Sequence, residues 1–202
     1  GSPLPLNHQN AFPMRHTPRT QDGGGPQTDT SPESQIERLM LWDDRSEKLI
    51  QQDHPDIGWL FYDRNGDGVP DEGYSRSFPL IDVMEIHPID SVLKITQFDT
   101  QNNKPYNNQR ILNWLQLLNQ GFRIYGVVNT DAHYNWHGSG WLRNWIQSST
   151  DDPSKIDAME MVHASEQGRL IMSNGPYIEA TFTGDKNQHA VSGQELNAAS
   201  GN

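Results

Sequence analysis

The chain lacks cysteine altogether, so disulfides, thiolate metal ligands and a cysteine nucleophile are all excluded. It is also poor in apolar residues, which make up 33% of its 202 residues, and this low share predicts long polar loops. No apolar run reaches the roughly 18 residues that a membrane-spanning helix needs. The sequence therefore predicts neither a membrane-spanning segment nor a membrane partner.

Positive charge is scarce as well. Lys and Arg together number 15 against 26 Asp and Glu, which gives a net charge of −11. Without a basic stripe to offset phosphate charge, unaided binding to DNA, RNA or an anionic membrane is not expected. The sequence also has no Gly-x-Ser-x-Gly, no phosphate-cradling loop and no dinucleotide fingerprint, so serine-hydrolase and nucleotide-binding functions lack support. We expect a small-molecule substrate instead.

The chain divides by composition into three parts. Residues 1–35 are so rich in proline and glycine that regular structure is not expected there, except for a strand end at residues 4–8. Residues 36–182 carry the regular periodic patterns and form the predicted domain. Residues 183–202 are polar and small, which predicts a frayed tail.

Helical and strand patterns alternate along the chain, which favours an α/β fold with mainly parallel strands. Ser31 and Pro32 indicate a helix start, and the apolar spacing extends that helix to about Gln52. The other expected elements are a strand over 80–86, a helix over 106–120, a strand over 122–129, a helix over 156–166, and strands over 170–176 and 177–182.

An apolar run ends abruptly in Asp131-Ala132-His133. Residues two apart on an extended segment point the same way, so Asp131 and His133 can aim at one point where a strand opens into a loop. A carboxylate oxygen and an imidazole nitrogen together suit Zn²⁺, Mn²⁺ or Fe. His137, in the glycine-rich loop that follows, could act as a catalytic acid that protonates a leaving group.

Other candidate residues occur at predicted strand ends. The proline after His54 forces that histidine out of the α conformation, which fits either a metal ligand or a surface turn. His8 lies among amides that could orient it, and it is either a ligand or a plain surface histidine. Glu85 and His87 repeat the two-residue spacing. Glu85 could be a ligand or a general base, or it could satisfy a neighbouring backbone group or arginine.

A separate acidic segment favours a second hypothesis. Asp63, Asn65, Asp67 and Asp71 resemble the first half of an EF-hand-like Ca²⁺ loop, although an acidic turn has the same composition. The tryptophans of residues 136–146 could line a pocket for an aromatic or sugar-like group, or they could simply pack. These features suit a non-catalytic recognition module that binds Ca²⁺ and a carbohydrate or protein.

The tryptophan-rich segment also contains Arg143, which could pair with an anionic substrate group. The alternative hypotheses differ in the metal they require, since an enzyme centre needs Zn, Mn or Fe and the recognition module needs Ca²⁺. For either, a periplasmic or secreted address is favoured.

Four segments together resemble the PHP superfamily of metal-dependent hydrolases, in its carbaryl-hydrolase-like branch. They are Asn-His-Gln-Asn at 7–10, Asp-His-Pro at 53–55, Val-Val-Asn-Thr-Asp-Ala-His at 127–133 and the run from Gly168 to Ala180. The resemblance covers most of residues 4–182. It implies a distorted (β/α)7 TIM-like barrel with metals at the carboxyl ends of the strands.

Matched motif by motif, His8, His54, Asp131 and His133 correspond to the later metal ligands of the family. The resemblance implies one to three divalent ions that activate water to attack a phosphoester, ester or carbamate. The family's opening His-x-His motif and its ligand glutamate have no counterpart here. We therefore expect a C-terminal portion of a longer enzyme, with an incomplete barrel whose open edges favour a homo-oligomer or pairing with the missing N-terminal segment. A fragment that holds no metal is the third hypothesis.

Overall fold

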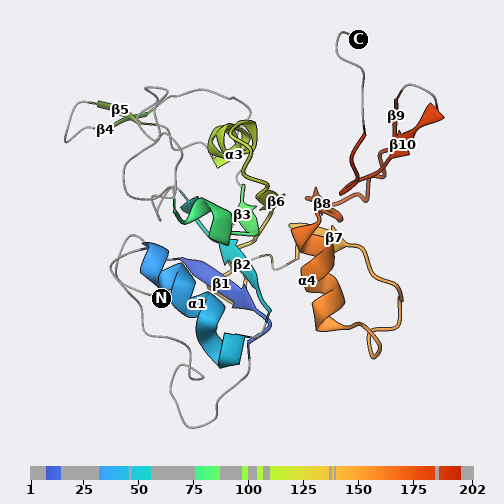
Figure 1. The fold of residues 1–202 in the computed structure, drawn as a ribbon, viewed down its shortest axis with the longest axis horizontal. Helices are drawn as coiled ribbons and strands as arrows, with labels where there is room; N and C mark the ends of the chain where they lie inside the picture. The colour runs from blue at the N-terminus through green and yellow to red at the C-terminus, as the bar shows by residue number, and fades with distance from the viewer. Residues whose placement is uncertain are drawn as a thin grey trace. The chain divides into compact units, whose positions relative to one another are not determined.

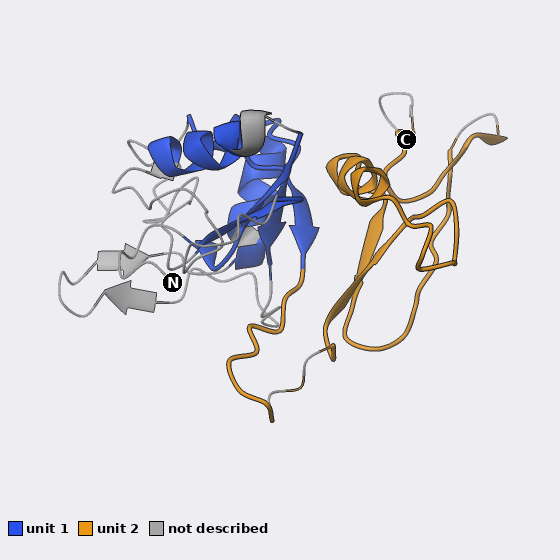
Figure 2. Cartoon of the chain, turned by 90° about the horizontal axis from the view of Figure 1, so that it is seen from below, with its two compact units in different colours: residues 1–127 blue, residues 128–202 orange. Residues whose placement is uncertain are grey.

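The computed structural model of this chain falls into two units, residues 1–127 and residues 128–202, shown in Figure 2. The structure describes residues 8–14, 32–45, 47–55, 76–86, 97–99, 104–106, 110–136, 138, 140–184 and 187–196. The division between the units lies inside the predicted 36–182 domain. Each unit is described by itself below.

Unit 1 is built on a four-stranded sheet with the order β1-β2-β3-β6 (Figure 1). Its strands are β1 (Gln9–Phe12), β2 (Leu49–Gln52), β3 (Val83–Glu85) and β6 (Tyr125–Val127). The strands β2, β3 and β6 are parallel, whereas β1 runs antiparallel to β2. The start of β1 therefore lies at the same sheet edge as the carboxyl ends of the parallel strands.

Two helices and a 3-10 turn, η1 (Phe78–Leu80), accompany this sheet. The helix α1 (Pro32–Arg45) contacts β1 and β2, and α3 (Arg110–Asn119) precedes β6. The helix α3 is followed by Gly121 at φ +90°, a conformation that glycine adopts without the steric cost of a side chain. A small antiparallel hairpin of β4 (Gln97–Asp99) and β5 (Lys104–Tyr106) completes the unit.

The core of unit 1 includes residues of α1, β2 and β3. Ile36, Ile50 and Val83 are fully buried, and Met84 is almost fully buried. Val83 and Met84 are neighbours on β3 and point to opposite faces of the sheet, so both faces of this strand are covered. Burial of one such side chain contributes roughly 1.5–3 kcal/mol.

Unit 2 contains two short antiparallel sheets and one helix. The strands β7 (Arg143–Ile146) and β8 (Leu170–Ser173) pair with each other, as do β9 (Phe182–Thr183) and β10 (His189–Ala190). The helix α4 (Ala158–Glu166) contacts β7.

The start of α4 and the chain that follows β10 are each fixed by side-chain hydrogen bonds. The carboxylate of Asp157 accepts the Met159 N–H at 3.0 Å and so caps the helix. The Ser192 hydroxyl donates to the carbonyls of Gly168 and Leu170, at 2.9 Å each. Within the predicted 183–202 tail the structure therefore describes a strand, β10, and a hydrogen-bonded Ser192.

The mixed α/β class predicted from the sequence is confirmed. The strands of the described residues belong to four separate sheets, and these residues do not close a barrel. The predicted helices over 106–120 and 156–166 contain α3 and α4, and the predicted strands over 80–86, 122–129 and 170–176 contain β3, β6 and β8. None of the described helices is long and apolar enough to cross a membrane.

The predicted continuation of the first helix to Gln52 is wrong, because α1 ends at Arg45 and residues 49–52 form β2. The ammonium group of Lys48 turns back and donates to the carbonyls of Met40 (3.5 Å) and Trp42, which closes the last turn. From Leu49 onward every second residue is buried, which is the period of a strand.

The strand end predicted for residues 4–8 lies mostly outside the described residues. The strand itself is β1, which begins after His8 instead of ending at it. His8 still reaches the predicted sheet edge, because β1 runs in the opposite direction to its neighbour.

Candidate metal centre

The carboxyl edge of the unit 1 sheet brings three predicted site residues close together. In the antiparallel ladder Gln9 pairs with Gln52, so His8 lies beside the residues that follow β2. There the backbone N–H of Asp53 donates to the carbonyl of His8 at 2.7 Å. His54 follows at once, and Glu85 ends the neighbouring parallel strand β3.

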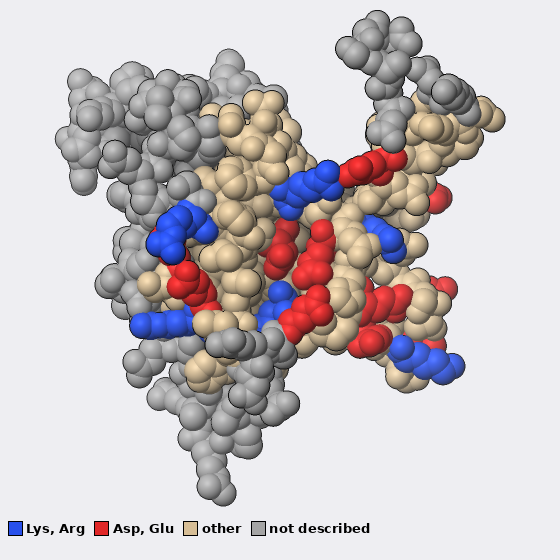
Figure 3. Space-filling model, viewed as in Figure 1, with Lys and Arg blue, Asp and Glu red and all other residues tan. Residues whose placement is uncertain are grey.

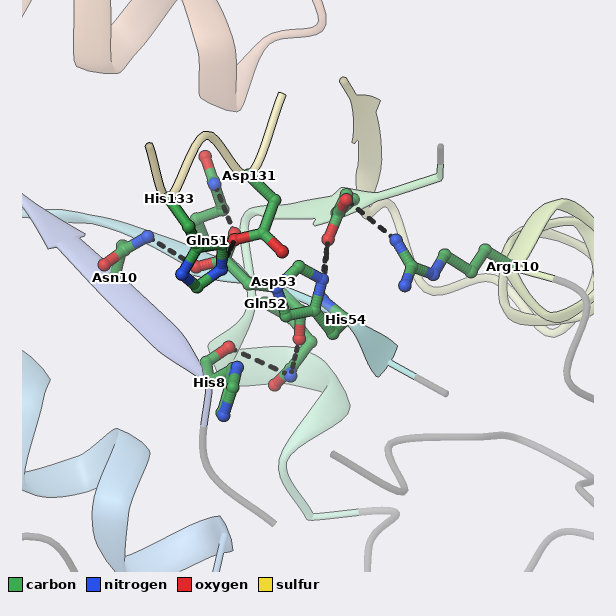
Figure 4. A network of polar contacts seen from close by, with 10 residues as sticks. His8, Asn10, Gln51, Gln52, Asp53, His54, Arg110, Asp131 and His133 are labelled. Atoms are coloured by element: carbon green, nitrogen blue, oxygen red, sulfur yellow. Dashed lines mark hydrogen bonds and ion pairs between the residues drawn. The ribbon is translucent and has the colours of Figure 1, made fainter. Parts of the chain in front are cut away.

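Glu85 is the most constrained side chain of this edge, with 2% of it exposed. Its Oε2 lies 2.7 Å from the ring Nδ1 of His54 and accepts the backbone N–H of the same residue at 2.7 Å. Its Oε1 lies 2.7 Å from the guanidinium Nη1 of Arg110, the first residue of α3. Figure 4 labels His54 and Arg110, each at the end of a dashed line that marks one of these contacts.

These contacts keep Glu85 ionised although it is buried. Burial by itself raises the pKa of a carboxyl group. The hydrogen bonds from the His54 side chain and backbone, together with the charges of Arg110 and His54, outweigh burial and hold the pKa of Glu85 below the ordinary glutamate value. The carboxylate is therefore a permanent acceptor at neutral pH.

His54 adopts a left-handed backbone conformation, with φ +41°. A non-glycine residue in this region is uncommon, although histidine enters it more often than most. The following Pro55 disfavours the α conformation, as the sequence predicted, and the hydrogen bond to Glu85 fixes the backbone N–H. Backbone strain of this kind concentrates at functional sites.

His8 meets His54 ring to ring, with centroids 5.2 Å apart and planes at 63°. Its backbone carbonyl also accepts a hydrogen bond from Nε2 of Gln52 at 3.2 Å. This amide comes from β2 and differs from the neighbouring amides that the sequence offered to orient the His8 ring.

Asp53 is a buried member of the edge that the sequence did not single out. Its Oδ1 accepts Nε2 of Gln51 at 2.6 Å, and its Oδ2 accepts Nδ2 of Asn10 (Figure 4). The Asp-His-Pro triplet was visible in the sequence. It did not indicate that Asp53 is buried and that His54 is partly exposed.

In unit 2, the side chains of Asp131 and His133 contact each other. His133 Nε2 lies 2.9 Å from Asp131 Oδ1, and both side chains are exposed, at 66% and 52% respectively. Asp131 has φ +45°, so the segment is not a plain extended strand. The chain before the pair is held by Asn144, whose amide accepts from the Val128 N–H at 3.0 Å and donates to the Val128 carbonyl at 2.9 Å.

Arg143 is the first residue of β7, and its side chain donates hydrogen bonds to two backbone carbonyls. Its Nε donates to the Gly140 carbonyl at 3.0 Å, and its Nη1 donates to the Gly175 carbonyl at 3.5 Å. The side chain remains exposed, and its predicted pairing with an anionic group stays a prediction. The predicted acid His137 and the calcium candidates Asp63, Asn65, Asp67 and Asp71 lie outside the described residues.

The helix α4 carries a further histidine–carboxylate pair, which the sequence did not single out. Nδ1 of His163 lies 3.4 Å from Oε2 of Glu166 on the next turn. Each of these two residues can offer one ligand atom to a metal ion. The three-residue spacing on a predicted helix is the signal that could have found this pair.

Basic side chains do not gather on the face drawn in Figure 3, where Lys and Arg lie apart from one another among Asp and Glu. Arg76, for example, lies 3.6 Å from Glu33 and 3.9 Å from Glu37 of α1.

No family model, no curated protein and no solved structure matches this chain.

Proposed function

We propose that this chain provides metal ligands and water-activating chemistry to a divalent-metal-dependent hydrolase acting on a phosphoester, ester or carbamate. One observation carries the proposal: His54 stands at a strand end with its Nδ1 on a buried carboxylate and a second histidine ring beside it. Metal-ligating histidines usually donate their other ring N–H to a carboxylate, a carbonyl or a water.

The proposed ligands of unit 1 are His8 and His54. Unit 2, taken by itself, offers Asp131 and His133. These nitrogen and oxygen donors suit Zn, Mn or Fe. A bound ion of this kind lowers the pKa of a water ligand toward about 7 and polarises the scissile group. The PHP-type barrel and the proton-donating role of His137 belong to the same proposal.

The exposure and the contacts of two pairs, Glu85–His54 and Asp131–His133, determine the role that each pair can have. In unit 1 the acid is already bonded through both oxygens, so Glu85 supports His54 and is poorly placed to be a general base. In unit 2 the carboxylate and the imidazole are both exposed, so they can exchange their mutual contact for a metal ion at small cost.

Metal content tests the proposal. Protein purified without chelator or added metal is analysed for each element, for the wild type and for His54→Ala, Asp131→Ala and His189→Ala. His189→Ala is the matched control, because it removes an exposed histidine of the β9–β10 hairpin. We expect Zn, Mn or Fe near one or more per chain, lost in the first two variants and kept in the control. Calcium alone, or no metal in the wild type, would contradict the proposal.

A second candidate is the non-catalytic recognition module. It is favoured by the exposed aromatic pair of Tyr134 and Trp136, whose rings stack 4.7 Å apart while 78% of Trp136 is exposed. Calcium binding by calorimetry would support this candidate if it is lost in Asp63→Ala and Asp67→Ala. Retention of calcium binding in both variants would remove it.

A further inference from the structure

We propose that Glu85, anchored by Arg110, is a positioning residue that holds His54 as the Nδ1–H tautomer and leaves Nε2 as the atom presented to a metal. The metal half of this inference rests on the proposed function. The tautomer half concerns the metal-free protein and stands or falls independently.

The contact between the Glu85 and His54 side chains shows which ring nitrogen of His54 carries the hydrogen. An ionised carboxylate is an acceptor only, so a 2.7 Å contact to Nδ1 requires the hydrogen to lie on that nitrogen. In a neutral imidazole the other nitrogen, Nε2, then carries a lone pair. Neutral histidine in water prefers the opposite tautomer, so the protein has to impose this one.

The carboxylate of Glu85 fixes both the backbone and the side chain of His54. Oε2 of Glu85 receives both the ring N–H and the backbone N–H of His54. The backbone N–H fixes the left-handed main chain, and the ring N–H fixes the side-chain torsions. The imidazole is therefore oriented before any ligand arrives, which is what a precise metal ligand requires.

Arg110 contacts the other oxygen of the same carboxylate, Oε1. Only 10% of the Arg110 side chain is exposed, and its planar guanidinium presents several donors in a fixed geometry. By occupying Oε1 it leaves Oε2 for His54 and prevents the carboxylate from turning away. The pair joins the start of α3 to the end of β3, so the fold itself sets the direction of the glutamate.

The competing explanation is that Glu85 and Arg110 form a buried ion pair of purely structural use. Removal of one partner alone would leave an uncompensated buried charge and strongly destabilise the unit whichever explanation holds. We therefore choose the double variant Glu85→Gln/Arg110→Met, which removes both charges at once. The matched control is Asp152→Asn/Lys155→Met, which removes the exposed pair of unit 2, 2.9 Å long.

The first measurement is the ¹⁵N NMR spectrum of the His54 ring in metal-free protein, about two pH units above the ordinary histidine pKa of about 6.5. In the wild type and the control we expect the Nδ1–H pattern, and in the double variant a shift toward Nε2–H. A structural ion pair would leave the tautomer unchanged, and that result overturns the proposal.

The second measurement is Zn²⁺ affinity by competition with a chromogenic chelator. We expect the double variant to bind roughly 10- to 100-fold more weakly than the wild type, as for loss of a supporting carboxylate, and the control to bind as the wild type does. If the double variant does not fold, Arg110→Lys keeps the charge but loses the planar fork, and we expect a loss of less than about 10-fold.

The outcomes separate the two proposals. An Nδ1–H tautomer in a wild type that binds no metal supports the positioning role and overturns only the metal-dependent hydrolase. Metal binding with an Nε2–H tautomer does the reverse. Equal zinc affinity in the wild type and the folded double variant overturns the positioning role.

Discussion

The two units each hold a carboxylate–imidazole pair of nearly the same length in very different surroundings. In unit 1, His54 and Glu85 lie 2.7 Å apart with exposures of 12% and 2%, while in unit 2, His133 and Asp131 lie 2.9 Å apart with exposures of 66% and 52%. Coulomb attraction at such distances is weak in water and strong in a protein interior. The buried acid is bound on both oxygens and is fixed, whereas the exposed pair competes with water.

This difference shows that a short contact alone does not identify a strong interaction. Glu85 gains three donors in return for its lost hydration: the backbone N–H and ring N–H of His54 and the guanidinium of Arg110. Asp131 keeps its hydration, so its contact with His133 adds little to stability, and its oxygens stay accessible to a cation.

The largest expected effect comes from breaking the buried cluster on one side. Arg110→Met leaves Glu85 without its arginine in the interior, and we expect unit 1 to lose about 3–5 kcal/mol of unfolding free energy. Denaturation followed by fluorescence can report this, because Trp114 donates to the Ile124 carbonyl at 2.7 Å within the same unit. A loss below about 1 kcal/mol would mean that the cluster is not buried in solution.

The next largest effect is expected from acid, which protonates Glu85 and so lowers the free energy of unfolding. The pKa of Glu85 is lower in the folded chain than its ordinary value, so the stability that it contributes is present above about pH 4.3 and is lost as the pH falls through the lower folded value. Denaturation of the metal-free wild type and of Glu85→Gln/Arg110→Met at pH 6 and at successively lower pH tests this sign. We expect the wild type to lose more stability in acid than the double variant. An equal loss in both proteins would assign the acid sensitivity to other carboxylates.

In unit 2 the expected effects are smaller and come from the backbone. Asn144→Ala removes both hydrogen bonds to the main chain of Val128, and unpaired buried backbone groups cost about 1–3 kcal/mol. Hydrogen exchange of the Val128 amide should rise in this variant. Asn174→Ala, at an exposed turn, is the control that should leave that amide protected.

The smallest effect is expected for the exposed pair itself. Asp131→Asn should change the unfolding free energy of the metal-free protein by no more than about 0.5 kcal/mol, and salt should reduce the change further. Thermal unfolding at low and high salt checks this expectation. A loss of several kcal/mol would show that Asp131 is part of a buried cluster, which contradicts its exposure here.

The sequence predicted the local features of both pairs better than their partners. The proline after His54 is a local signal, and it anticipated that this residue leaves the α conformation. The two-residue spacing of Asp131 and His133 is also local, but it did not indicate the positive φ of Asp131. Arg110 could not be predicted as the partner of Glu85, because only the packing of α3 beside β3 brings the two together. The hypothesis that Glu85 satisfies a backbone group and an arginine, left open from the sequence, describes these contacts.

The error over residues 49–52 has the same origin. Leu49 and Ile50 continue the apolar spacing of the preceding helix, so a pattern of sequence alone extends it. Tertiary pairing with β1 and β3 decides otherwise, and the histidine that follows gains its position from that pairing. The candidate site therefore depends on a strand that local propensity did not indicate.

The lysine that closes α1 has a consequence for covalent chemistry. Lys48 is 7% exposed and its amine is engaged with helix carbonyls, whereas 72% of the Lys155 side chain is exposed. An acylating reagent should therefore label Lys155 quickly and Lys48 only when the junction between α1 and β2 opens. The ratio of the two labelling rates, read by peptide mass spectrometry, would time the opening of the segment that leads into His54.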